Sequence, residues 1–139
     1  MGEIKLTYQV DGGDLIQAGE ASSKMKMPLK KLGLPAEAIR RASICMYEGE
    51  INMVIHADGG RVEVDVGMDA ITLRLIDHGP GIPDVNQAME EGFTTAGDVA
   101  RDLGFGAGMG LPNMKRYSDE MRIDTTVGVG TTVTMKIRI

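Results

Sequence analysis

Apolar residues alternate with charged or hydroxyl residues in four stretches of the chain. A period of two is typical of strands with one buried and one wet face, and such strands usually pair antiparallel. The short connection 67–70 between two of these stretches predicts a hairpin, and a further strand is expected at about 120–125. The alternating stretches are carried by Ile4, Leu6, Tyr8 and Val10; Val62, Val64 and Val66; Ile71, Leu73 and Leu75; and Val133, Met135, Ile137 and Ile139.

Helical spacing appears between the first two of these stretches. Gly33 is placed to end a first helix and Pro35 to open a second one. Pro28 is expected to bend or divide the first helix, because an interior proline removes a hydrogen bond. The mostly apolar stretch 36–57 predicts a central buried helix, and a third helix is expected from about 110 to 118. The first helix is indicated by Ala18, Ala21, Met25, Leu29 and Leu32.

The order of these elements predicts an α+β fold. We expect a two-layer sandwich in which about three helices cover one face of a mixed, mostly antiparallel sheet. With 139 residues, of which 42% are hydrophobic, the chain can bury one sizeable core and is interpreted as a single domain over residues 1–139. The span 84–108 is rich in Gly, Thr and acidic residues without a convincing strand, which is typical of a lid.

Composition narrows the classes of partner. A net charge of -5 with 4% aromatic residues argues against nucleic acid binding, which usually needs a basic face. A single cysteine, Cys45, excludes a disulfide framework, and no apolar run is long enough to cross a bilayer. The first residues also lack the apolar segment of a secretion signal. We therefore expect a cytoplasmic protein that does not bind membranes.

Polar residues interrupt the predicted central helix at regular spacing. Glu48, Asn52 and His56 are four residues apart and share one face. Asn52 could give its carbonyl oxygen to Mg²⁺ in a metal–nucleotide complex, and Glu48 could accept a proton from an attacking hydroxyl or water. The alternative is a solvated stripe on a surface helix. Glu50 points away from this face and is expected to be structural.

Two glycine clusters follow the predicted central helix along the chain. Asp77 ends an apolar strand before Gly79 and Gly81, where its carboxylate could accept a hydrogen bond from the exocyclic amine of adenine; the alternative is a plain turn. The cluster 104–110 precedes the third helix, so its unshielded N–H groups and the helix dipole suit phosphate. Neither a Walker loop nor a dinucleotide fingerprint is present, and the alternative is simple flexibility.

The polar face of the central helix and the two glycine clusters, in this order, resemble the motifs of the GHKL superfamily. Its ATP-binding domain, the Bergerat fold, is shared by gyrases, Hsp90, histidine kinases and MutL. Glu48 and Asn52 resemble its N box, Asp77-x-Gly-x-Gly81 its G1 box and 106–111 its G2 box, and the segment 128–132 resembles the closing Gly-Thr segment. The similarity covers essentially the whole chain. It implies the same sandwich that the periodicity predicts.

The resemblance also implies site residues and cofactors. ATP and Mg²⁺ would be the cofactors, with Glu48 as the general base, Asn52 as the Mg²⁺ ligand and Asp77 as the acceptor for adenine. Gly81 would permit contact with the base. The other positions that it implies around the nucleotide are Gly79, Ile82, Thr94, Thr95, Gly106, Gly108, Met109, Gly110, Leu111, Lys115 and Thr132.

Within the superfamily, the chain is most similar to the small anti-sigma-factor and switch-protein serine kinases. The segments 92–95 and 111–116, with Asp119-Glu120 after them, carry this similarity. It implies a serine/threonine kinase that transfers the ATP γ-phosphate to a small regulatory protein, with a sigma factor and a second copy of the chain as further candidate partners. Two alternatives stay open: a nucleotide-dependent protein-binding module without chemistry, and a simple ATPase.

Overall fold

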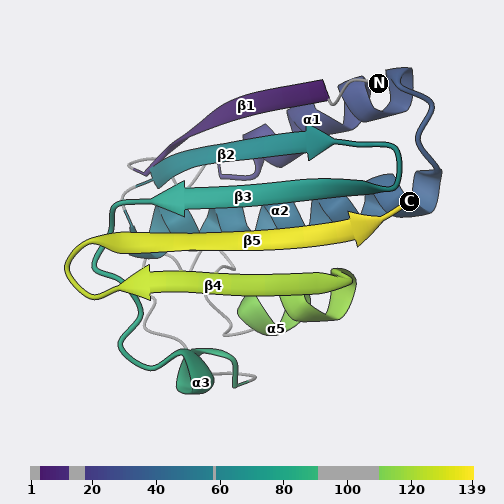
Figure 1. Cartoon of the computed structure of the whole chain (residues 1–139). Helices are drawn as coiled ribbons and strands as arrows, with labels where there is room; N and C mark the ends of the chain where they lie inside the picture. The colour runs from purple at the N-terminus through teal and green to yellow at the C-terminus, as the bar shows by residue number, and fades with distance from the viewer. Residues whose placement is uncertain (1–3, 13–17, 58, 91–109) are drawn as a thin grey trace.

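The computed structural model describes residues 4–12, 18–57, 59–90 and 110–139. Figure 1 shows a five-stranded sheet with helices α1, α2 and α5 packed on one of its faces. The small helix α3 lies apart from this layer. The elements are β1 (Ile4–Asp11), α1 (Glu20–Lys31), α2 (Ala36–His56), β2 (Gly59–Val66), β3 (Ala70–Asp77), α3 (Val85–Ala88), α5 (Gly110–Tyr117), β4 (Glu120–Thr126) and β5 (Gly130–Arg138).

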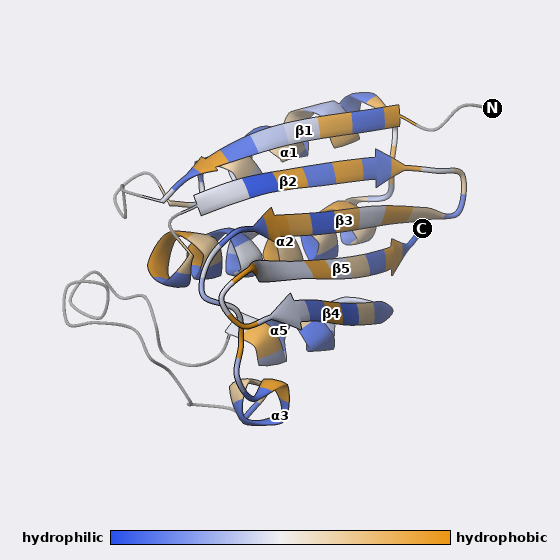
Figure 2. Ribbon diagram, turned by 60° about the vertical axis from the view of Figure 1, so that its left-hand side comes forward, coloured by the Kyte–Doolittle hydropathy of each residue, from blue (hydrophilic) through white to orange (hydrophobic). Residues whose placement is uncertain are grey.

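The strands lie in the order β1-β2-β3-β5-β4, and every neighbouring pair is antiparallel. The two-layer α+β sandwich and the β2–β3 hairpin that the sequence predicted are therefore confirmed. The expected mixture of directions is wrong for the described strands, because each of them pairs with its neighbours in the antiparallel sense. Figure 2 shows hydrophobic and hydrophilic bands alternating along the strands, which is why one face can carry the helices.

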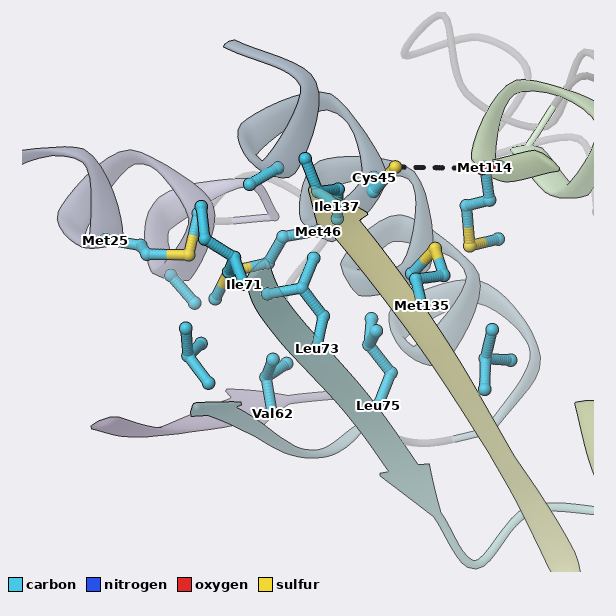
Figure 3. Close-up of a cluster of buried hydrophobic side chains, with 14 of the residues drawn as sticks. Met25, Cys45, Met46, Val62, Ile71, Leu73, Leu75, Met114, Met135 and Ile137 are labelled. Carbon is cyan, nitrogen blue, oxygen red and sulfur yellow. Dashed lines mark hydrogen bonds between the residues drawn. The ribbon is translucent and has the colours of Figure 1, made fainter. Parts of the chain in front are cut away.

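The core lies between the helices and this face of the sheet. Met46 from α2 and Leu73 and Met135 from the central strands are fully buried there, and Figure 3 shows their side chains meeting between the layers. Cys45 donates its thiol hydrogen to the carbonyl oxygen of Met114 at 3.7 Å, which ties α2 to α5. Burial raises the pKa of the Cys45 thiol to about 12, so it stays protonated and unreactive.

Pro28 does not divide α1, which was one of the two outcomes expected from the sequence. The helix runs without interruption from Glu20 to Lys31, and Leu32 closes it with a hydrogen bond to the Pro28 carbonyl oxygen at 3.1 Å. Only one backbone donor is missing, whereas Met25 and Leu29 on the inner face of the helix are completely buried. Packing against the core therefore outweighs the local cost of the proline.

A carboxylate from α2 caps the start of α1. Glu50, only 3% exposed, accepts hydrogen bonds from the backbone N–H groups of Gly19, Ala21 and Ser22 at 2.9, 3.1 and 3.0 Å. The N-cap residue Gly19 has no side chain to satisfy these donors, so Glu50 does so from a different helix. The structural role expected for Glu50 agrees with this position.

Replacement of Glu50 by glutamine should lower the free energy of unfolding by about 2 kcal/mol, because an amide offers one acceptor oxygen and turns an N–H group toward backbone donors. Urea denaturation of both proteins measures this loss. Glu37→Gln is the control on the same helix: Glu37 is exposed and its surface ion pair with Arg40 contributes little, so the midpoint should move far less than in Glu50→Gln. An equal midpoint for Glu50→Gln and wild type would contradict the capping role.

No helix within the described residues combines the length and hydrophobicity needed to cross a bilayer.

Candidate functional site

The polar residues of α2 face the first turn of α5. Glu48 accepts a hydrogen bond from the Asn113 side-chain nitrogen, with 2.6 Å between Oε2 and Nδ2. One helical turn further along α2, Asn52 lies against Gly110, so closely that a Cβ atom at position 110 would be 3.0 Å from its Oδ1 atom. Both side chains are half-buried. Glu48 and Asn52 therefore lie at a contact between two helices and not on a freely solvated surface, whereas His56 at the end of α2 is exposed.

The end of β3 holds the second predicted element. Asp77 uses one carboxylate oxygen, Oδ1, to accept hydrogen bonds from the backbone N–H groups of Gly79 at 2.9 Å and Thr131 at 3.2 Å. Its other oxygen, Oδ2, accepts none from the part of the chain that the structure describes. The carboxylate is thus fixed in orientation, and the described residues leave its Oδ2 atom available as an acceptor.

The loop after Asp77 is held at both ends by close backbone approach. Gly81 has a φ of 80°, and a Cβ atom there would lie 2.6 Å from the Thr126 carbonyl oxygen. A Cβ atom on Gly79 would be 2.6 Å from the Cβ atom of Ala57, at the end of α2. Because Asn52 is in the second-last turn of α2, this packing brings the glycine loop to the same end of the helix as Asn52.

The other predicted site residues lie at several places in the structure. Thr132 alternates with inward-facing Thr131 and Val133, so it belongs to the open face of the sheet. Leu111 is part of the hydrophobic core, and Lys115 is exposed in the last turn of α5. Ile82 donates its backbone N–H to Thr125 Oγ1 at 2.9 Å. Outside the described residues are the predicted positions Thr94, Thr95, Gly106, Gly108 and Met109, with most of the expected lid.

Sequence reasoning missed Asn113 and Thr131. Asn113 follows Gly110 by three residues, so helical spacing alone would have placed both on the face that meets α2. Thr131 reaches Asp77 through its backbone N–H group, as the residue directly opposite Asp77 in the β3–β5 pairing, and the alternation of either strand alone does not give that register. The signal for Asn113 was therefore the helical spacing of α5, which the family motifs do not contain.

A groove of about 670 Å³ opens between α1 and α2, and Glu48 is one of its lining residues. Lys26 of α1 and Tyr47 of α2 line it as well. Ser43, also in the lining, is 6% exposed, and its hydroxyl has no hydrogen-bond partner among the described residues. Glu48 therefore contacts α5 through Asn113 and also lines this groove.

Comparison with known proteins shows the family of the chain. Residues 39–139 match the family described as histidine kinase-, DNA gyrase B-, and HSP90-like ATPase. The serine/threonine-protein kinase RsbT of Bacillus subtilis is 32% identical over 108 residues, which cover 75% of each chain. An anti-sigma F factor of Clostridium beijerinckii is 32% identical over 73% of this chain, and the match spans 64% of that factor, less than two thirds of its length.

The solved structure of the RsbU and RsbW domains of Rv1364c from Mycobacterium tuberculosis has a similar fold. Its TM-score is 0.63 at 19% sequence identity, and the match covers 97% of this chain and 32% of that chain. The superfamily that the motifs indicated is thereby confirmed. The chain belongs to the family of histidine kinase-, DNA gyrase B- and HSP90-like ATPases.

Proposed function

We propose that this chain is an ATP-dependent serine/threonine protein kinase that transfers the γ-phosphate of ATP to a small regulatory protein. The observation that carries the proposal is the placement of Glu48 and Asn52 against the first turn of α5. The similarity to a serine/threonine-protein kinase and to anti-sigma F factors supports it. By the same similarity, a sigma factor and a second copy of the chain are candidate partners, and the cytoplasm is the proposed location.

Adenine recognition is assigned to Asp77. Its Oδ1 atom is occupied by two backbone donors, so Oδ2 can accept from the exocyclic amine of the purine. Guanine would place a carbonyl oxygen at the same position, and two acceptors facing each other repel. Gly81 holds the loop against the Thr126 backbone, where a Cβ atom would not fit, and so keeps the loop next to Asp77. This arrangement supports a preference for ATP over GTP.

Phosphate binding is assigned to the start of α5, where the first-turn N–H groups lack partners inside the helix and the helix dipole favours negative charge. Mg²⁺ shared with nucleotide phosphates needs only one or two protein ligands, and the described residues hold no group of three His, Cys, Asp or Glu that could cage a metal alone. The carboxamide oxygen of Asn52, held beside Gly110, fits that limited role. When bound, the metal neutralises charge on the phosphates during transfer.

Glu48 is assigned the role of general base. Its carboxylate would orient the hydroxyl of the acceptor serine or threonine and take its proton as the oxygen bonds to the γ-phosphorus. The bond from that phosphorus to the β–γ bridging oxygen breaks, and ADP leaves. The groove between α1 and α2 gives the acceptor a route to Glu48 from the side opposite α5.

Labelled ATP separates this proposal from its alternatives. The protein is used in a pull-down from native cytoplasm, once with γ-labelled ATP and once with ADP. The proteins that it retains are then examined by mass spectrometry. Phosphoserine or phosphothreonine on a retained protein is the expected result. A stable nucleotide-dependent complex without transferred label would instead identify a binding module, and release of free phosphate without any acceptor would identify a simple ATPase.

Gly110→Ala should weaken binding of Mg-ATP about tenfold, or about 1.4 kcal/mol. The reason is that the added methyl group would meet the Asn52 carboxamide at 3.0 Å and displace it. Isothermal titration calorimetry measures the affinity. Gly67→Ala is the control, since a Cβ atom there makes only an ordinary contact with Ala70 at 3.7 Å. Normal binding by Gly110→Ala would argue against Asn52 as a ligand of the nucleotide-bound metal.

A further inference from the structure

We propose that Asn113 is a positioning residue, which holds the Glu48 carboxylate in the orientation that proton transfer requires. The inference rests on the proposed kinase function. The two side chains come from different helices and are 65 residues apart in sequence, yet Nδ2 and Oε2 are 2.6 Å apart in a half-buried setting. A hydrogen bond to an ionised acceptor at this distance is of the strong, charge-assisted kind.

The contact leaves the base able to act. Asn113 donates to Oε2 only, and Oε1 of Glu48 accepts no hydrogen bond within the described ranges of the chain. Of the two oxygens, Oε1 is the one that can take the proton of the acceptor hydroxyl while the bond from Asn113 to Oε2 persists. An uncharged amide suits this role, because an arginine or lysine at position 113 would stabilise the ionised carboxylate and make it a weaker base.

Packing of α5 does not explain Asn113. Leu111 and Met114 are the buried residues of this helix and make its apolar contact with the core. Asn113 and Gly110 form a separate face, three residues apart, directed at Glu48 and Asn52. The helix α5 thus contacts both Glu48 and Asn52 of α2. These two contacts fix the distance between the start of α5, where the phosphates are proposed to bind, and Glu48, the proposed base. Such fixed geometry is worth large factors in rate.

Asn113→Asp tests the inference in the intact chain, because aspartate has the same shape but cannot donate when ionised. We expect the transfer rate at saturating ATP and acceptor to fall about 10- to 100-fold, while the KM for ATP changes by less than about twofold. Gln9→Glu, the same amide-to-acid change at an exposed position of β1, should leave both values unchanged. A wild-type rate for Asn113→Asp would overturn the inference.

A double-mutant cycle asks whether Asn113 acts through Glu48. Asn113→Ala should slow transfer in the wild-type background and change it by less than about twofold in a Glu48→Ala background. An equal loss in both backgrounds would mean that Asn113 acts independently of the carboxylate, and the inference would fall.

A spectroscopic measurement separates failure of the inference from failure of the proposed function. In ¹⁵N-labelled protein without nucleotide or partner, the side-chain amide signal of Asn113 should shift in Glu48→Ala and stay in place in Glu37→Ala. An unmoved signal in Glu48→Ala overturns the inference even if the protein is a kinase. A wild-type protein that transfers no phosphate overturns the kinase proposal, whatever the Asn113 signal does.

Discussion

Replacement of Glu48 by glutamine is expected to slow phosphoryl transfer about 10²- to 10⁴-fold, the usual contribution of a positioned general base. Glutamine keeps the length of the side chain and can still accept a hydrogen bond from Asn113 through its carbonyl oxygen. It cannot take the proton of the acceptor hydroxyl. The affinity for Mg-ATP should therefore stay close to that of the wild type.

Single-turnover transfer of labelled phosphate measures the rate, and calorimetry measures ATP affinity on the same preparations. Glu37→Gln is the control on the same helix, because Glu37 is exposed and pairs with Arg40 by an ion pair of 2.9 Å. A rate of label transfer in Glu48→Gln equal to that of wild type would remove Glu48 from the chemistry. A parallel loss of ATP affinity would assign it to nucleotide binding instead.

Asp77→Asn should weaken ATP binding by about 1.5 to 3 kcal/mol, or roughly 10- to 150-fold. An asparagine would direct its carbonyl oxygen to the backbone donors of Gly79 and Thr131 and turn its amide group to the purine. Two donors would then face each other at the exocyclic amine of adenine. The same amide could donate to the carbonyl oxygen of guanine, so the preference for ATP over GTP should narrow.

Titration calorimetry with ATP and GTP measures both effects. Asp69→Asn, an exposed change in the connection between β2 and β3, should alter neither affinity. Because the introduced asparagine can still accept from both backbone donors, the Asp77→Asn variant should fold, and a denaturation curve checks this. An ATP affinity equal to that of wild type in a folded Asp77→Asn protein would remove Asp77 from the site.

The fold could be predicted because its signals are local. Alternation over 62–66 and 71–75 located two strands that pair as a hairpin, with Val64 opposite Leu73. The apolar stretch 36–57 corresponds closely to α2. In each case the buried residues recur at the period of the strand or helix, so a short window of sequence is enough to locate the element.

Contacts between distant segments could not be predicted in this way. Glu50 caps α1 from another helix, and Asn113 reaches Glu48 across 65 positions. Helical spacing places Asn113 on the same face as Gly110, but it does not say which side chain of another helix either Glu50 or Asn113 contacts. The helix α1 continues through Pro28 because burial of Met25 and Leu29 outweighs the cost of the proline, and this burial is a tertiary effect. The motifs indicated the family, whereas the roles of Glu48, Asn52 and Asp77 stay predictions that the experiments above test.

A crystal structure of the chain with Mg²⁺ and a non-hydrolysable ATP analogue tests the central claim most directly. We expect the adenine amine within hydrogen-bond distance of Asp77 Oδ2, the metal on Asn52 Oδ1, and the γ-phosphate between the first turn of α5 and Glu48. An analogue bound elsewhere on the protein, or contacts that omit these three side chains, would contradict the account.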